Sequence, residues 1–197
     1  MKGRNPMKKF IFPAIFLTML ILSVFAYAYD VSDNLESSLI RLHILAESDS
    51  EYDQSIKLAV RDEVLKAVRG VDADDTAAFT ACAEAAANEY LKDKNIPYRA
   101  HAEYGLFDFP VKQYMNIILP AGHYYGVRIV LGSGSGHNWW CVMYPPLCVN
   151  GTDAYADDKA EAELKKHLRN DTYDVITSDS EKKQVRFRIV DLINSLK

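Results

Sequence analysis

Cysteine is scarce in this chain, with three residues among 197, at Cys82, Cys141 and Cys148. Six residues separate Cys141 from Cys148, and neither this spacing nor the scattered histidines match the short ligand spacings of zinc sites. We therefore expect no metal and no cofactor. Because the number of cysteines is odd, at least one has no partner within the chain. Cys82 lies on an apolar helical stripe and is expected to be buried and unpaired.

Basic residues are few outside the N-terminus. Four of the 23 Lys and Arg residues lie within the first nine positions, and without them 19 basic residues face 27 acidic ones. Proteins that bind nucleic acid or anionic lipid neutralise phosphates with clustered basic side chains. An acidic chain without a basic stripe therefore predicts neither of these partners.

Long apolar stretches are absent except for one run of about sixteen residues, from Phe10 to Phe25. Basic residues precede this run and the sequence AYAYD follows it, which is the pattern of a secretory signal peptide. We predict a signal peptide over 1–28, cleaved after Ala28, and one domain over 29–197. The alternative is an uncleaved membrane anchor, although the run is short for a spanning helix and contains Pro13. In both cases the domain is exported.

The remaining chain shows strand and helix patterns in turn. Residues 30–38 are polar and are expected to be a short lead-in. The helix predicted over 50–69 begins with a capping box formed by Ser48 and Glu51 or by Ser50 and Asp53. This order predicts a single α+β domain with a mostly antiparallel sheet of about four to five strands packed by helices. The patterns predict strands over 39–46, 96–104, 115–119, 124–131 and 139–144, and helices over 50–69, 74–94, 154–169 and 179–196.

The segment GSGSG, at 132–136, raises the question of a nucleotide-binding loop. Such a loop needs a helix N-terminus after it, because helix amides hold the phosphates. Here the strand-like sequence NWWCVMYPP follows, and no Lys-Ser or Lys-Thr closes the run. We therefore predict a flexible hairpin loop between the strands 124–131 and 139–144, and no small-molecule substrate.

The histidines raise the question of catalysis. A cysteine nucleophile needs a positioned histidine, but His137 lies four residues from Cys141, which is about 13 Å along a strand. His43 and His101 lie on predicted strands that could be neighbours. With Glu103 they give an alternative hypothesis, an exported envelope hydrolase, which requires adjacent strands and a shared cleft. Our leading expectation is that the chain is not an enzyme and has no catalytic residues.

Residues 137–148 combine large aromatic side chains with a stiff backbone. Trp139 and Trp140 are adjacent on a predicted strand and so point to opposite faces. One can anchor the core while the other faces solvent, or the terminal helices can cover both. An exposed tryptophan beside a proline-stiffened loop suits a protein-binding hot spot. The predicted partner-binding surface consists of His137, Trp139, Trp140, Tyr144, Pro145 and Pro146.

Cys141 and Cys148 are candidates for a disulfide, because export permits oxidised cysteines. A proline turn could bring their Cα atoms within the required distance of about 7 Å. Closing a loop of this size contributes about 2–3 kcal/mol. The alternative is two reduced cysteines that pack as small apolar residues.

Two segments resemble the stage II sporulation protein R family. The first is LIRLHILAESDSEYDQSIKLAVRDEVL, at 39–65, and the second covers 109–148 and ends in NWWCVMYPPLC. The second string is highly specific, and together the two segments identify the chain as a member of that family.

The resemblance implies a developmental signal and no established catalytic residues. Such proteins are made in the forespore and exported across its membrane into the space between forespore and mother cell. There they trigger a membrane-embedded aspartyl protease of the mother cell, which processes the precursor of sigma-E. The expected partner of this chain is therefore that protease.

Overall fold

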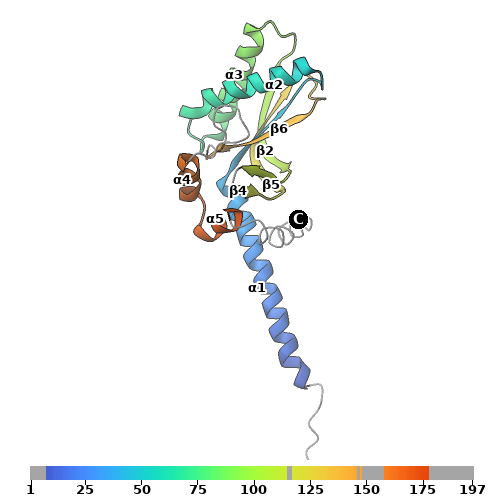
Figure 1. The fold of residues 1–197 in the computed structure, drawn as a ribbon, viewed down its shortest axis with the longest axis vertical. Coiled ribbons are helices and arrows are strands. Elements are labelled where there is room, and N and C mark those ends of the chain that lie inside the picture. Colours follow the sequence, from blue (N-terminus) through green and yellow to red (C-terminus); the bar gives the residue numbers. More distant parts are fainter. Residues whose placement is uncertain (1–7, 115–116, 146, 148–157, 178–197) are drawn as a thin grey trace, which may run out of the picture.

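The computed structural model describes residues 8–114, 117–145, 147 and 158–177. Within them, an α+β domain stands at one end of a long N-terminal helix, α1 (Lys8–Ser38), as Figure 1 shows. The domain holds one four-stranded sheet and one two-stranded sheet, with helices packed on them. The predicted fold class is confirmed.

The four-stranded sheet has the order β2 (Ala100–Phe109), β5 (Gly122–Leu131), β1 (Ile40–Leu45) and β6 (Asn138–Tyr144). β2 pairs with β5 and β6 pairs with β1 in antiparallel fashion, whereas β1 and β5 are parallel. The parallel pair arises because the helices between β1 and β2 return the chain to the far side of β5 rather than beside β1. A short antiparallel pair, β3 (Lys112–Tyr114) and β4 (Ile117–Leu119), forms the second sheet.

Two helices cover one face of the large sheet. α2 (Glu51–Ala67) begins at Ser50, whose hydroxyl accepts a hydrogen bond from the Asp53 amide at 3.1 Å, so the second of the two predicted capping frames is the correct one. A short 3₁₀ turn, η1 (Val68–Gly70), ends it, and α3 (Thr76–Asp93) follows. Both helices turn an apolar stripe toward the sheet, where they bury Val60, Val64, Phe79, Ala83, Ala87 and Leu91.

The two faces of β1 meet different surroundings, because neighbouring strand residues point to opposite faces. Leu42 and Ile44 share the helix-covered face with Val127 and Ile129 of β5, and all four are buried. Arg41 and His43 point to the other face, where both are also buried. The core therefore extends on both sides of β1, which explains why this strand contains few exposed positions.

The helix α1 continues past the predicted cleavage point without a break. Its N-terminal part, from Phe10, is exposed and is long and apolar enough to cross a membrane, which fits either a signal peptide or a membrane anchor. Its C-terminal part packs into the domain, where Val31 and Leu35 are buried. Residues 30–38, expected to be a short polar lead-in, form the last turns of this helix, because their few apolar residues recur at helical spacing and give the helix a face to bury.

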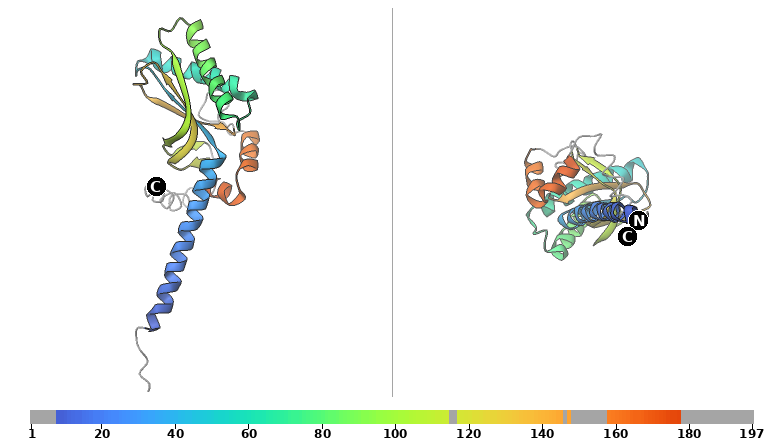
Figure 2. Two further views of the ribbon diagram at one scale, coloured as in Figure 1. Left: turned by 180° about the vertical axis from the view of Figure 1, so that it is seen from behind. Right: turned by 90° about the horizontal axis from the view of Figure 1, so that it is seen from below.

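The C-terminal part of the described chain forms two short helices beside α1, α4 (Asp158–His167) and α5 (Asn170–Thr177) (Figure 2). The predicted single helix over 154–169 matches α4, whereas α5 was not predicted. Arg169 lies between them and holds the carboxylate of Asp30 in α1 at 2.5 Å. The predicted helix over 179–196 lies outside the described residues.

Candidate functional site

Two loops that are far apart in the sequence meet at the end of β1. Residues 46–50 leave β1, and residues 132–137, which we call the crossover loop, connect β5 to β6. The Gly136 amide donates to the carbonyl of Ala46 at 2.9 Å, and the Ser135 amide donates to the carbonyl of Glu47 at 3.3 Å. The predicted flexible hairpin was wrong: β1 lies between β5 and β6, so the loop must cross the end of β1 and is bonded to it.

The glycines of the crossover loop allow this close approach. Gly134 has a positive φ of 65°, which is costly for a residue with a side chain. Gly136 lies against the loop from β1, and a Cβ atom there would be 2.3 Å from the Ser48 carbonyl oxygen. The repeated glycines that suggested a phosphate loop are therefore required by the contact between backbones.

We expect Gly136→Ala to lower the free energy of unfolding by about 2 kcal/mol, because the new methyl group collides with backbone that α2 holds in place. Gly70→Ala is the matched control, since a Cβ at Gly70 meets no atom within 4 Å. The control should change stability by less than about 0.5 kcal/mol. Urea unfolding of both variants measures the two free energies of unfolding. Equal values would show that the crossover loop shifts to accommodate the methyl group without loss of stability.

An exposed pair of side chains, His137 and Asp49, lies where the two loops meet. The His137 amide donates to Asp49 Oδ1 at 2.6 Å, and the imidazole Nδ1 contacts the same oxygen. The backbone hydrogen bond first, and the imidazole second, lower the pKa of Asp49. Lys57 of α2 donates to the His137 carbonyl at 2.9 Å and to Gln54 Oε1 at 2.5 Å. The His137 ring is thus held in one place on the surface.

A second hydrogen-bonded group, centred on the Asp53 carboxylate, fixes the start of α2 next to this pair. The Asp53 carboxylate accepts hydrogen bonds from Ser48 at 2.5 Å, Ser50 at 3.0 Å and Tyr98 at 2.9 Å. The bond from Ser48 is the largest of the effects that lower the pKa of Asp53. Sequence reasoning interpreted the segment Ser48–Asp49–Ser50 only as a helix cap and missed the role of Asp49. The run of five polar residues from Glu47 to Glu51, shortly after a buried strand, was the available signal.

The predicted partner-binding residues do not form one exposed corner. Trp139 is only 8% exposed and packs on the helix-covered face, with the Arg61 guanidinium 4.8 Å from its ring centre. Pro145 is buried as well. The expected exposure is thus wrong for these two residues: α2 covers Trp139, and Pro145 is buried directly after β6. His137 is exposed, and Pro146 lies outside the described residues.

Trp140 lies on the opposite face of β6 from Trp139, whereas Tyr144 lies beyond a register shift in the pairing with β1. Both are half-buried. The Trp140 ring stacks on the His43 imidazole with 3.6 Å between ring centres. The Tyr144 hydroxyl lies 2.8 Å from Nε2 of His167 in α4. These two aromatic residues can each present one edge to a partner, although neither projects freely.

The arrangement required by the hydrolase hypothesis is not present. β5 lies between β1 and β2, so His43 and Glu103 are separated by two strand spacings, or about 10 Å. Arg128 occupies the position between them and its Nε donates to Glu103 at 2.6 Å. His101 is exposed and lies 3.2 Å from Glu84 of α3. The three proposed groups therefore share no cleft, and the hypothesis fails on geometry.

The cysteines are placed as follows. Cys82 on α3 is free, as predicted, but it is half-buried rather than buried. Cys141 is fully buried in β6 on the helix-covered face. Cys141 is disulfide-bonded. Cys148 lies outside the described residues, so its assignment as the partner of Cys141 stays a prediction.

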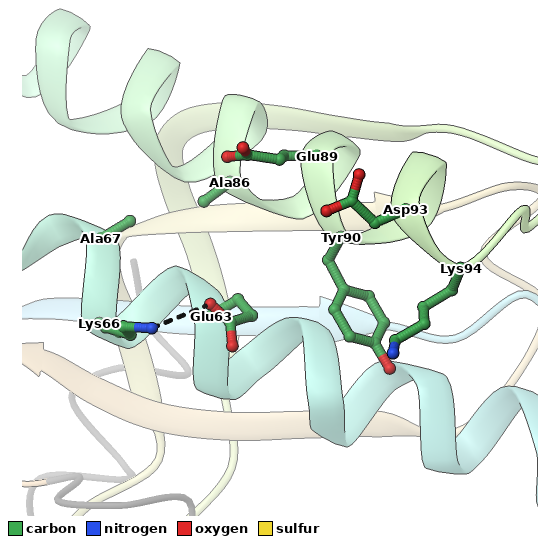
Figure 3. A pocket seen from close by; sticks show the side chains of 8 residues that line it. All are labelled: Glu63, Lys66, Ala67, Ala86, Glu89, Tyr90, Asp93 and Lys94. Carbon is green, nitrogen blue, oxygen red and sulfur yellow. Dashed lines mark ion pairs between the residues drawn. The ribbon is translucent and has the colours of Figure 1, made fainter.

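A surface groove of about 520 Å³ lies between α2 and α3 (Figure 3). Three carboxylates, of Glu63, Glu89 and Asp93, line it together with Lys66 and Lys94. Glu63 pairs with Lys66 at 3.7 Å. No serine, cysteine or histidine lines the groove, and no group of three metal-ligating side chains occurs in the described part of the chain. The groove is an open surface seam between two helices, and its charged side chains are those expected of solvated helix faces.

Comparisons with known proteins match the region that contains both loops. The model of a family described as stage II sporulation protein R matches residues 36–155. The chain is 36% identical over 139 residues to the stage II sporulation protein R of Bacillus subtilis (strain 168). The aligned region covers 64% of this chain and 62% of that protein. The alignment thus spans less than two thirds of that relative. No solved structure matches the chain.

Proposed function

Because the chain belongs to the stage II sporulation protein R family, we propose that it is an exported signal of endospore formation that activates a membrane aspartyl protease of the mother cell. The activated protease then processes pro-sigma-E. The observation that carries this proposal is the family match across residues 36–155, which includes β1, the crossover loop and β6. The chain acts as a ligand in this proposal, and the protease supplies the chemistry.

A ligand activates a protease by binding its active conformation more tightly than its inactive one. A surface whose side chains are already fixed loses little conformational entropy on binding and so gains affinity. The His137–Asp49 pair has this property, since Lys57 and the backbone bonds of the crossover loop fix it from below. We therefore place part of the protease contact at this exposed pair, next to the half-buried edge of Trp140.

The apolar helix α1 supports the proposed location. An apolar helix preceded by basic residues exports the chain that follows it, whether or not the helix is later removed. Export from the forespore places the domain in the space between the two membranes, where the outer surface of the mother-cell protease is accessible. An acidic domain surface is also consistent with a protein target rather than a lipid one.

The test is a reconstituted mixture of the purified chain, the protease in liposomes and pro-sigma-E, scored for cleavage. We expect His137→Ala to lower the cleavage rate about tenfold, equivalent to about 1.4 kcal/mol of binding free energy. His101→Ala is the matched control, because it removes another exposed histidine that faces a carboxylate. It should leave the rate unchanged.

The possible results test the proposed function separately from the proposed contact at the His137–Asp49 pair. Absence of cleavage with the unmodified chain would contradict the proposed function. Cleavage that is normal with both variants would keep the function and remove the His137–Asp49 pair from the contact. Thermal unfolding of each variant ensures that a lower rate does not arise from lost folding.

A further inference from the structure

The strand β2 forms one edge of the large sheet, and α3 covers only the first part of that edge. The side chain of Asn88 accepts from the Ala100 amide at 3.0 Å and donates to the Ala100 carbonyl at 2.9 Å. The carboxylate of Glu84 accepts from the Ala102 amide at 2.7 Å. Two residues of α3 thus take the place of a neighbouring strand over Ala100–Ala102.

The alternation of an antiparallel pair extends this pattern along β2. Backbone groups of alternate residues point to the same side of a strand, and β2 pairs with β5 without a register shift from Ala100 to Phe109. Tyr104, Leu106 and Asp108 therefore direct their amides and carbonyls outward, as Ala100 and Ala102 do. In the part of the chain that the structure describes, no backbone group bonds to this side of the strand. We call residues 104–108 the open edge.

Exposed apolar side chains accompany the open edge. Tyr104 is 37% exposed, Leu106 is 53% exposed, and Tyr125 on the neighbouring strand β5 is 44% exposed. The rings of Tyr104 and Tyr125 stack in parallel with 5.8 Å between their centres. These three side chains share the face that α2 and α3 cover further along the sheet, as their register shows. Figure 2 shows the two long strands continuing beyond the end of α3.

Natural sheets protect a free edge with lysine, proline or a bulge, because an unprotected apolar edge pairs with other chains. The sequence of the open edge, YGLFD, contains no lysine or proline, and its pairing contains no bulge. The chain protects one half of β2 with α3 and leaves the other half unprotected. This contrast within a single strand indicates a binding surface.

We propose that the open edge binds an extended segment of the partner protease, which adds to the sheet as a fifth strand beside β2. This inference rests on the proposed function for the identity of the partner. Strand addition supplies main-chain hydrogen bonds for affinity, and side-chain contacts on one face supply selectivity. The segment spans about five residues, or about 17 Å, and places apolar side chains beside Tyr104 and Leu106.

A partner segment fits the open edge better than a second copy of this chain does. A two-fold pairing centred on Leu106 would set Asp108 of one copy opposite Tyr104 of the other. Each copy's Pro110 would then reach the part of the edge that α3 already occupies. An isolated extended segment has no such helix beside it. The segment is uncharged or basic, because the exposed carboxylate of Asp108 disfavours an acidic neighbour.

Leu106→Pro tests the inference through the backbone. Proline removes the outward amide of Leu106, and a strand tolerates proline only where the amide faces away from its sheet. We expect the variant to fold and to cleave pro-sigma-E at least tenfold more slowly than the unmodified chain. Leu106→Val retains the amide and should keep most of the activity. A second pair guards against misfolding: Leu106→Arg should be inactive, whereas Leu58→Arg, at an exposed leucine of α2, should be active.

Amide hydrogen exchange supplies a readout that does not depend on cleavage. Addition of the protease in liposomes should slow exchange of the Tyr104, Leu106 and Asp108 amides at least tenfold. Protection without cleavage would support the open edge and contradict the proposed function. Unchanged exchange at these amides, or full activity of folded Leu106→Pro, would overturn the inference. Protection that appears in the chain alone and rises with its concentration would overturn it in favour of self-pairing.

Discussion

Trp139→Ala is expected to lower the free energy of unfolding by about 3–5 kcal/mol, the usual cost of deleting a large buried aromatic side chain. Trp139 lies opposite Ile44 of β1, beneath α2, and its removal leaves a cavity between the sheet and that helix. It also removes the ring that faces the Arg61 guanidinium at 4.8 Å, and a desolvated cation loses a favourable contact. A domain of this size has a total stability of roughly 5–15 kcal/mol, so the variant is close to unfolding at growth temperature.

Trp140→Ala is the matched comparison, because it deletes the same side chain from the neighbouring position. Because Trp140 is half-buried, Trp140→Ala should lower the free energy of unfolding less than Trp139→Ala does, although it removes the stack on His43. Urea unfolding of the two variants measures the difference. If Trp139→Ala lowered the free energy of unfolding less than Trp140→Ala did, Trp139 would not be a core residue. Loss of signalling in Trp139→Ala therefore reports on folding, and of the two tryptophans only Trp140 can test a contact with a partner.

Acid should destabilise the domain through His43. Burial is the main cause that lowers the pKa of His43 to about 4; the nearby Asn138 side chain opposes this shift and the charge of Arg128 adds to it. The rings of Trp140 and Phe109 face the imidazole from β6 and β2. The unfolded chain therefore binds a proton near pH 6.5, whereas the folded chain does so only near pH 4. The contribution of His43 to the free energy of unfolding is therefore fully present above pH 6.5. It falls as the pH drops from 6.5 to 4, by about 3 kcal/mol in total.

The measurement is urea unfolding at intervals between pH 7 and pH 4. His43→Gln removes the titrating group and should flatten this part of the profile. His101→Gln is the control, because His101 is exposed and its removal should leave the slope unchanged. A slope that survives in His43→Gln would assign the acid sensitivity to carboxylates instead. The buried histidine is then a structural residue that limits the pH range of the fold.

Local patterns predicted the elements of this chain well. The alternation around Leu42 and Ile44 indicated β1, and the polar residues around Ser50 indicated the start of α2, because strand pleat and helix capping depend on neighbouring residues. The order of the strands could not be predicted in this way. Glycines between two strand patterns favour a hairpin, and nothing in 132–136 reveals that β1 separates β5 from β6. That arrangement depends on contacts between residues almost ninety positions apart.

The candidate site could likewise be predicted where it depends on neighbouring residues and not where it depends on distant contacts. The sequence placed Trp139 and Trp140 on opposite faces of a strand, which is confirmed. It could not predict which face the helices cover, and so it could not tell the buried tryptophan from the half-exposed one. Asp49 and Lys57 were missed because their importance comes from the crossover loop that folds onto them. Side chains that act through tertiary contacts have no local pattern of their own.

The unbroken course of α1 constrains when the N-terminal segment can be removed. Proteases cut exposed, irregular chain, but Ala28 is buried within a continuous helix once Val31 and Leu35 have docked. Removal must therefore precede docking, and slow removal would leave the domain tethered. A tethered domain would stand at a fixed height above the bilayer, since the helix from Phe10 to Tyr27 measures about 27 Å, close to the thickness of the hydrocarbon layer. The speed of folding relative to removal thus decides whether the domain is released or stays attached to the membrane.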